Sequence, residues 1–496
     1  MKYKSILFIA LLLLLPIRET IAQSSKKRLP TTKKTEKKQE KPQIPATLSA
    51  TKPISREEKL KEFTAKEAEL VAKIERSPRD AKLYNDLGVV RFYLGKLAEA
   101  ELALKQAIEL DPSFADPRAN LSFYYFQTER DAAGEDMLRT AIALDPNSFL
   151  ANYYSGIFYF RRNQPTRAEI YLKRAIELQP KNLEVRLDLA KVYRAQKNEA
   201  EAEKQLDELL LLAPEDPGVR YARAVFYGES NRYTEAIKEF ERVLLLNPAL
   251  DSIHFEIAIA AARLGNWTKA IDELELLHKK QSTPQSLYML GFCYLQLNRT
   301  EEAVLQFKRT LEAKPDFYEA HLELGKVYSN QQDLKLAIDE FQHAISARPE
   351  SIEARYLLGY CNELQGQYDQ AKLQYEELLK RAPERFEGHH GLGSVAIRQN
   401  DPAALNYLKK ALELGGKTAD VHYLLGRAQS KAGELEAAVE NFKKAAQLDS
   451  TRPDIHYQMA LALKRLGRET EANQELEIVE QLNKKFRTGM STEGQR

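Results

Sequence analysis

Residues 318–349 read YEAHLELGKVYSNQQDLKLAIDEFQHAISARP, and this stretch decides the fold. Its large apolar residues recur every three or four positions in two runs, which predicts two amphipathic helices. Pro349 closes the second run, because proline lacks the amide donor that a helix needs and clashes with the turn before it. Neither helix can bury its apolar face alone, so the pair must stack against neighbours.

The same pattern returns every 34 residues from about Ala81 to Lys485. A small residue occupies the eighth position of each unit and an alanine the twentieth position of most units, which lets paired helices approach closely. The period predicts a stack of similar helix pairs in place of several globular domains. The twelve predicted units start at Ala81, Ala115, Phe149, Leu183, Pro217, Asp251, Pro284, Tyr318, Ile352, Phe386, Ala419 and Pro453.

The repeat resembles the tetratricopeptide repeat (TPR), through Leu324-Gly325, Tyr328, Ala337, Phe341, Ala344 and Pro349. This resemblance implies an all-α protein, an α-solenoid of stacked helix-turn-helix units that form a right-handed superhelix. Two units depart from the pattern. The sixth is one residue short, with Ser282 where proline is expected, and the tenth loses a residue in its turn and ends with Gly415-Gly416. We expect bends at these two places.

The ends of the chain differ from the repeats. Residues 1–22 carry Lys2 and Lys4 before an apolar run and end in Thr20-Ile21-Ala22, which is typical of a signal peptide. We therefore expect export to the periplasm or the extracellular space, with an uncleaved membrane anchor as the alternative. Residues 23–54 are predicted to be a disordered basic Lys/Thr/Pro-rich linker, 55–80 an N-terminal capping helix, 81–485 the solenoid, and 486–496 a polar tail.

Charge is unevenly distributed. Residues 23–53 hold nine Lys/Arg against Glu36 and Glu40, whereas residues 54–496 hold 62 Lys/Arg against 69 Asp/Glu. The basic arm, 26–41, is either a soluble tether or a peripheral contact with an anionic membrane or envelope surface. The acidic body disfavours nucleic-acid binding. Oligomeric state does not follow from these features.

No catalytic, cofactor or metal site is predicted. His254, His321, His389, His422 and His456 all occupy the fourth position of their units, where packing explains them, and adjacent helix layers about 8–10 Å apart keep them from sharing an ion. Cys293 and Cys361 occupy equivalent positions two units apart, so they are predicted to be buried free thiols. An enzyme would need a site that the sequence does not show.

In the TPR family the first helix of each unit lines a concave groove, with its fifth, ninth and twelfth residues directed inward. Aromatic residues recur at these positions here, and tyrosine suits peptide binding because it joins an apolar ring to a hydroxyl. The opposing interpretation is that these rings pack in the helix seam. The predicted peptide-binding groove comprises Phe92, Phe123, Phe126, Tyr153, Phe160, Lys191, Arg194, Tyr221, Phe255, Tyr288, Phe292, Lys326, Tyr356, Tyr360, Tyr423, Arg427 and Tyr457.

Two functions fit this groove. The first is an exported scaffold or adaptor that binds peptide segments of partner proteins and needs no cofactor. The second is a module that binds a polysaccharide or cell-wall polymer, with tyrosines as stacking platforms. The second is disfavoured because the only tryptophan, Trp267, is predicted to lie in a turn.

Overall fold

The computed structural model describes residues 56–493, and all of its regular structure in that range is helical. The chain divides into two compact units, one ending at Lys280 and the other beginning at Gln281. The division falls beside Ser282, where the sixth repeat is short. The predicted signal peptide at 1–22 and basic linker at 23–54 lie outside the described residues.

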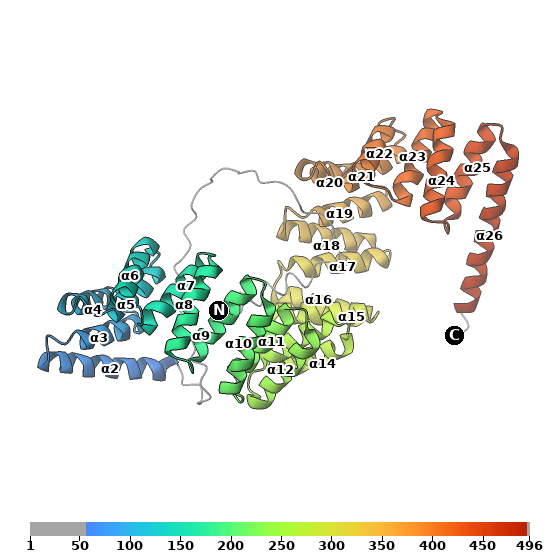
Figure 1. The fold of residues 1–496 in the computed structure, drawn as a ribbon. Coiled ribbons are helices and arrows are strands. Elements are labelled where there is room, and N and C mark those ends of the chain that lie inside the picture. Colours follow the sequence, from blue (N-terminus) through green and yellow to red (C-terminus); the bar gives the residue numbers. More distant parts are fainter. Residues whose placement is uncertain (1–55, 494–496) are drawn as a thin grey trace. The chain divides into compact units, whose positions relative to one another are not determined.

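Unit 1 contains thirteen described helices (Figure 1). They are α2 (Arg56–Arg76), α3 (Ala81–Tyr93), α4 (Leu97–Leu110), α5 (Asp116–Gln127), α6 (Asp131–Leu144), α7 (Phe149–Arg161), α8 (Pro165–Leu178), α9 (Leu183–Ala195), α10 (Glu199–Leu212), α11 (Pro217–Glu229), α12 (Tyr233–Leu246), α13 (Ser252–Arg263) and α14 (Trp267–His278).

Unit 2 contains twelve described helices. They are α15 (Pro284–Gln296), α16 (Thr300–Ala313), α17 (Tyr318–Asn330), α18 (Leu334–Ala347), α19 (Ile352–Leu364), α20 (Tyr368–Arg381), α21 (Phe386–Arg398), α22 (Ala404–Glu413), α23 (Ala419–Ala432), α24 (Leu435–Leu448), α25 (Pro453–Arg465) and α26 (Glu469–Glu493). The prediction of an all-α solenoid of paired helices is confirmed, and the first helices begin within one residue of the predicted unit starts.

Each helix pair turns at a residue with positive φ at the fifteenth repeat position. Glycine fills this position in five repeats, such as Gly95 (φ 77°) and Gly366 (φ 76°), and asparagine in four, such as Asn163 (φ 57°). Glycine has no Cβ to clash in the left-handed region, and asparagine tolerates that region better than most residues. Lys197 (φ 61°) adopts the same conformation without either advantage. A fixed turn of this kind sets the register of the two helices.

The small eighth residue brings the two helices of a repeat together. A Cβ atom added to Gly325 on α17 would lie 2.5 Å from the ring of Phe341 on α18. The equivalent approach in unit 1 is that of Gly156 to Leu172, at 2.5 Å. Phe341 and Leu172 are both fully buried. The packing predicted from the small residues is therefore confirmed.

First helices of neighbouring repeats also contact each other. In unit 2, α19 contacts α21, α21 contacts α23, and α23 contacts α25. In unit 1, α3 contacts α5, and α5 contacts α7. Second helices of neighbouring repeats make no comparable contact within residues 56–493. We call the surface formed by the fifth, ninth and twelfth positions of these first helices, together with the second position one turn before the fifth, the first-helix face of each unit.

The two ends of the described chain are also helical. Helix α2 packs on α3, with Leu70 buried and Phe63 half-buried against Leu87. Helix α26 continues to Glu493, so regular structure extends into the segment predicted as a polar tail. Within the described part of the chain, no helix is both long enough and apolar enough to cross a membrane.

Candidate functional site

Aromatic residues at the fifth repeat position pack on the second helix of their own repeat. The ring of Tyr356 on α19 lies 6.0 Å from that of Tyr375 on α20, and Tyr423 on α23 lies 6.2 Å from Phe442 on α24. Burial raises the pKa of Tyr356 to about 12. These tyrosines are half-buried, so each ring contributes to the core and still reaches the surface.

Unit 1 carries a continuous series of ring contacts across its first helices. Phe92 on α3 packs edge-on against Phe123 on α5 at 5.5 Å, and Phe123 stacks on Tyr154 of α7 at 5.0 Å. The series extends in one direction to Tyr93 and Phe63, and in the other to Tyr153 and Phe149. These rings hold neighbouring repeats together, so packing explains much of the aromatic content of this face.

The predicted groove residues differ widely in exposure. Phe126 and Tyr288 are buried: Phe126 stacks on Phe158 at 4.5 Å, and Tyr288 packs between Phe307 and Phe317. These two were assigned to the groove from their repeat positions, but their side chains belong to the core. The exposed members are Lys191, Tyr360 and Tyr457, and the half-buried ones are Phe92, Phe123, Tyr153, Phe160, Arg194, Tyr221, Phe255, Phe292, Lys326, Tyr356, Tyr423 and Arg427.

The predicted basic residues already have partners within the chain. Lys326 bridges Glu323 at 3.0 Å and Glu353 at 2.9 Å. Lys191 pairs with Asp188 at 2.7 Å, and Arg194 pairs with Glu229. The Arg427 guanidinium lies over the Tyr423 ring, 5.7 Å from its centroid. A ligand at Lys191, Arg194 or Lys326 would have to compete with these carboxylates.

The first-helix face of unit 2 combines exposed tyrosines with polar atoms that lack partners. Tyr360 on α19 and Tyr457 on α25 are 43% and 47% exposed, unlike the buried Tyr288. Between them, on α21, Oε2 of Glu387 and Nε2 of His390 are buried and have no hydrogen-bond partner among residues 56–493. We call Tyr356, Tyr360, Glu387, His390, Tyr423 and Tyr457 the unit 2 patch.

The part of the unit 2 patch around Tyr356 and Tyr360 is acidic, whereas Arg427 and Arg452 lie over the ring of Tyr423. Burial lowers the pKa of His390, which favours the neutral imidazole, while the nearby carboxylates of Asp420 and Glu387 act in the opposite direction. Burial raises the pKa of Glu363 on α19, although this carboxylate accepts a hydrogen bond from Ser394 at 2.5 Å. Carboxylates gathered around a neutral histidine favour a ligand that brings hydrogen-bond donors or positive charge.

Models of the tetratricopeptide repeat match residues 81–114, 124–182, 159–225, 221–286, 288–352, 330–394 and 430–467. Together these matches span well over half of the chain. This chain is a tetratricopeptide repeat protein. Proteins of this family generally act as scaffolds for protein–protein interaction. No curated protein sequence matches the chain.

The chain is also similar to several solved structures. A chain of the APC/C hetero-tetramer Cut9-Hcn1 is 16% identical, with a TM-score of 0.41, 86% of this chain covered and 94% of that one. The C-terminal part of a TPR protein from Cytophaga hutchinsonii is 18% identical, with a TM-score of 0.41 and coverage of 48% and 99%. YrrB, described as a TPR protein with an unusual peptide-binding site, is 19% identical, with a TM-score of 0.30 and coverage of 38% and 97%.

The fourth repeat position of this TPR protein carries a polar latch that the sequence did not reveal. In unit 2, His321 on α17 contacts Glu340 on α18 at 2.6 Å and the carbonyl of Pro315 at 2.9 Å. In unit 1, Arg220 makes the same two contacts, with Glu239 and the Pro214 carbonyl, each at 3.0 Å.

Other repeats use the latch in whole or in part. His254 pairs with Glu273, His422 with Asn441 and His456 with Glu475, and His389 keeps only the contact with the Pro383 carbonyl. The histidines were attributed to packing alone, whereas four of them also join the two helices of a repeat through a polar contact. His321 and His389 contact the turn before the first helix.

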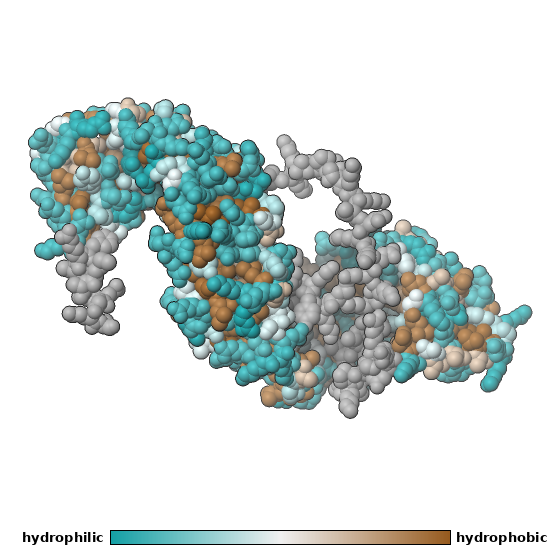
Figure 2. Space-filling view, turned by 180° about the vertical axis from the view of Figure 1, so that it is seen from behind, coloured by the Kyte–Doolittle hydropathy of each residue, from teal (hydrophilic) through white to brown (hydrophobic). Residues whose placement is uncertain are grey.

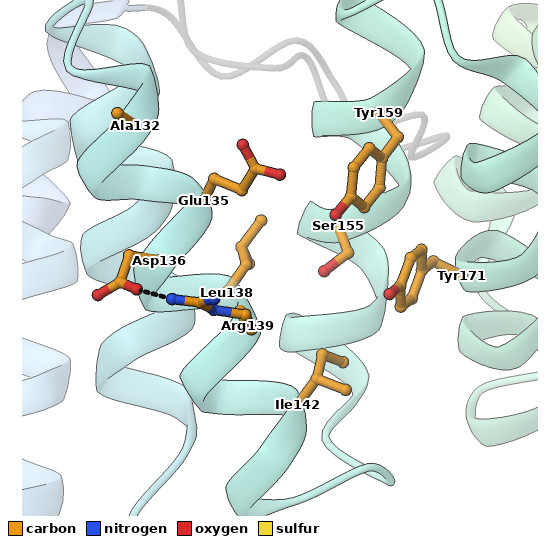
Figure 3. A pocket seen from close by; sticks show the side chains of 9 residues that line it. All are labelled: Ala132, Glu135, Asp136, Leu138, Arg139, Ile142, Ser155, Tyr159 and Tyr171. Atoms are coloured by element: carbon orange, nitrogen blue, oxygen red, sulfur yellow. Dashed lines mark hydrogen bonds and ion pairs between the residues drawn. The ribbon is translucent and has the colours of Figure 1, made fainter.

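A pocket in unit 1 was also not anticipated (Figure 3). Figure 3 shows the side chains of α6 on one side and Tyr159 and Tyr171 on the other. The two tyrosine rings are stacked, with their centroids 5.5 Å apart. The pocket has a volume of about 450 Å³ and is lined by Ala132, Glu135, Asp136, Leu138, Arg139, Ile142, Ser155, Tyr159 and Tyr171. It uses the seventh and eleventh positions of α7, so it lies outside the predicted groove.

Proposed function

We propose that this TPR protein is a scaffold that binds peptide segments of partner proteins on the first-helix face of unit 2. The observation that carries the proposal is the pair of buried polar atoms on α21, Oε2 of Glu387 and Nε2 of His390, that lack a partner within residues 56–493 and lie close to Tyr356 and Tyr360. A buried polar atom without a hydrogen bond costs about 1–3 kcal/mol. A bound segment that supplied the missing partners would recover that cost.

The tyrosines give the patch its affinity for polypeptide. Tyr356 and Tyr423 are anchored on Tyr375 and Phe442, so these rings are already ordered before a ligand arrives. Contact with an ordered ring costs little side-chain entropy, which is one reason why tyrosine is enriched at interaction surfaces. Tyr360 adds a second ring that is 43% exposed, and both Tyr360 and Glu387 lie near Tyr356.

The charge of the patch defines the segment that fits best. Glu363, Glu387 and Asp420 lie around Tyr356 and Tyr360, and Asp420 is paired with Arg452. In the described part of the chain, the one ion pair of Glu387 is a long contact with Arg385 at 3.5 Å. A lysine or arginine of the partner segment would donate a hydrogen bond to Glu387 Oε2. The residues next to that lysine or arginine would pack on the tyrosines.

The cellular location in this proposal rests on the sequence. Residues 1–22 have the features of a signal peptide, so the scaffold would act in the periplasm or outside the cell, with N-terminal anchoring as the alternative. The basic arm at 26–41 would then contact an anionic envelope surface or act as a tether. The binding of a polysaccharide remains the alternative function, although Trp267, the only tryptophan, begins α14 and is not part of the unit 2 patch.

The experiment is affinity capture from the native envelope fraction with the full chain and with two variants. In the first variant, Tyr360→Ala and Tyr457→Ala remove the two most exposed rings of the patch. In the second, Leu305→Ala and Leu373→Ala remove exposed apolar side chains from the second helices α16 and α20 of the same unit. The proposal requires that specific protein partners captured by the parent chain are lost with the tyrosine variant and kept with the leucine variant. Equal capture by both variants would show that the patch is not the binding surface, and capture of polysaccharide alone would favour the alternative function.

A further inference from the structure

Three side chains of the eighth repeat bring metal-ligating atoms together. His321 on α17 and Glu340 and His343 on α18 each offer one ligand atom, and these atoms all lie within 4.8 Å of one another. His321 is 7% exposed, Glu340 is partly buried, and His343 is exposed. Glu340 and His343 are three residues apart on one helix, so they share a face that meets α17.

The hydrogen bond of His321 to the backbone prepares its other nitrogen for a metal. Nε2 of His321 lies 2.9 Å from the carbonyl oxygen of Pro315, which accepts only, so Nε2 carries the proton in this contact. Nδ1 then faces Glu340. A histidine that donates one ring N–H to a backbone carbonyl is oriented and made more basic at the other nitrogen, as metal-bound histidines usually are.

From this arrangement we propose that His321, Glu340 and His343 bind a zinc ion, through Nδ1 of His321, a carboxylate oxygen of Glu340 and a ring nitrogen of His343. Two imidazoles and one carboxylate form a ligand set that suits zinc, and water or another ligand would complete the tetrahedron. The ion would join α17 to α18 on the polar latch of this repeat and would displace the proton that lies between His321 and Glu340.

The rearrangement that the ion requires is small. Ligand atoms of a tetrahedral zinc site are separated by roughly 3.3 Å, given bonds of about 2.0–2.1 Å. Nδ1 of His321 and Oε2 of Glu340 are 2.6 Å apart, so they must separate slightly. The His343 ring stacks on that of His321 at 5.1 Å with a 19° interplanar angle, and it must turn so that a nitrogen faces the ion. His343 can turn because its side chain is exposed.

Two other repeats have the same histidine–glutamate pair without the third ligand. His254–Glu273 and His456–Glu475 have the same 2.6 Å contact as His321–Glu340. Where the eighth repeat has His343, three residues after the glutamate, these repeats have Leu276 and Ile478. The histidine–glutamate pair is therefore a structural latch in all three repeats, and the third ligand distinguishes the eighth.

The test is titration of the full chain with zinc chloride near neutral pH. Isothermal titration calorimetry measures the binding, and thermal unfolding measures its effect on stability. We expect one saturable site per chain, with an upward shift of the unfolding transition. His343→Ala should weaken zinc binding by at least about tenfold while the metal-free protein unfolds as before, because His343 is exposed. Leu276→His adds the third ligand to the His254–Glu273 pair at a position that is 43% exposed, and should create a second site.

Two results would overturn the site. One is the absence of saturable zinc binding to the parent chain. The other is binding that His343→Ala leaves unchanged, which would assign the ion to other surface groups. Failure of this proposal would leave the proposed peptide-binding function untouched, because the three ligands lie outside the unit 2 patch.

Discussion

Gly325 on α17 faces the ring of Phe341 on α18 so closely that a Cβ atom at the glycine would lie 2.5 Å from the ring carbon Cε1. Phe341 is fully buried, so its ring cannot swing out into solvent. The eighth position of each repeat therefore limits how near its two helices can come.

Gly325→Ala should lower the free energy of unfolding by about 1–3 kcal/mol, because the added methyl group overpacks a filled seam. Gly228→Ala on α11 is the matched control, since nothing lies within 4 Å of a Cβ added there. That substitution should stabilise the protein by roughly 0.5–1 kcal/mol through helix propensity. Urea unfolding of the three proteins measures both effects, and a destabilisation shared by both variants would argue against the steric explanation.

The turn inside each repeat gives a second prediction. Lys197 has a φ of 61° at the position where nine of the twelve repeats carry glycine or asparagine. Lys197→Gly should raise the free energy of unfolding by roughly 1 kcal/mol, because a residue with a Cβ is strained in the left-handed region. Gly366→Ala, at the same repeat position with a φ of 76°, should lower it by a similar amount. Effects of the same sign at the two positions would contradict this interpretation of the turn.

The two cysteines should be chemically inert in the folded protein. Cys293 and Cys361 are buried free thiols, and burial raises the pKa of Cys293 to about 12. The thiolate is the reactive form, so almost none is present at pH 8. A thiol reagent such as Ellman's reagent should label neither cysteine in native buffer and both in denaturant. Rapid labelling of the native chain would show that the repeats containing them open readily.

Acid should selectively weaken an ion pair in unit 1. Arg130 lies 2.8 Å from Glu101, and this hydrogen bond holds the pKa of Glu101 down to about 2, from an ordinary value of 4.5. Because the folded-state pKa lies below the unfolded one, the stabilisation is complete above pH 4.5 and is lost as the pH falls toward 2.

Glu101→Gln should therefore lower the free energy of unfolding by up to about 1 kcal/mol at pH 7, since the arginine is partly exposed and screened. The difference from the parent chain should shrink below pH 4.5. Glu109→Gln, at an exposed glutamate of the same helix α4, serves as the control and should have little effect at either pH. A Glu101→Gln effect that does not vary with pH would mean that the side chain acts through packing alone.

The sequence was sufficient to predict the helix pairs because each local signal agrees with the 34-residue period. Small residues such as Gly325 and helix stops such as Pro349 act within one repeat, where sequence spacing translates directly into geometry. The buried state of the cysteines followed in the same way.

Which side chains are exposed on the first-helix face could be predicted only in part. A repeat position gives the direction of a side chain, but the exposure of that side chain depends on neighbouring repeats. Tyr288 and Tyr457 share the fifth position, yet one is buried between two phenylalanines and the other is 47% exposed. The latch at His321 was missed because its partner, Glu340, is 19 residues away and meets it only when the helices pair.

Site-specific photocrosslinking tests the proposed peptide-binding surface most directly. A photoreactive amino acid would replace Tyr360 on α19 in one protein and Leu373 on α20 in another, two positions of the same unit that are 43% and 47% exposed. Our account predicts that, in the native envelope, the position of Tyr360 forms crosslinks to peptide segments of specific partner proteins and the position of Leu373 does not. Equal crosslinking from both positions, or none from the position of Tyr360, would contradict it.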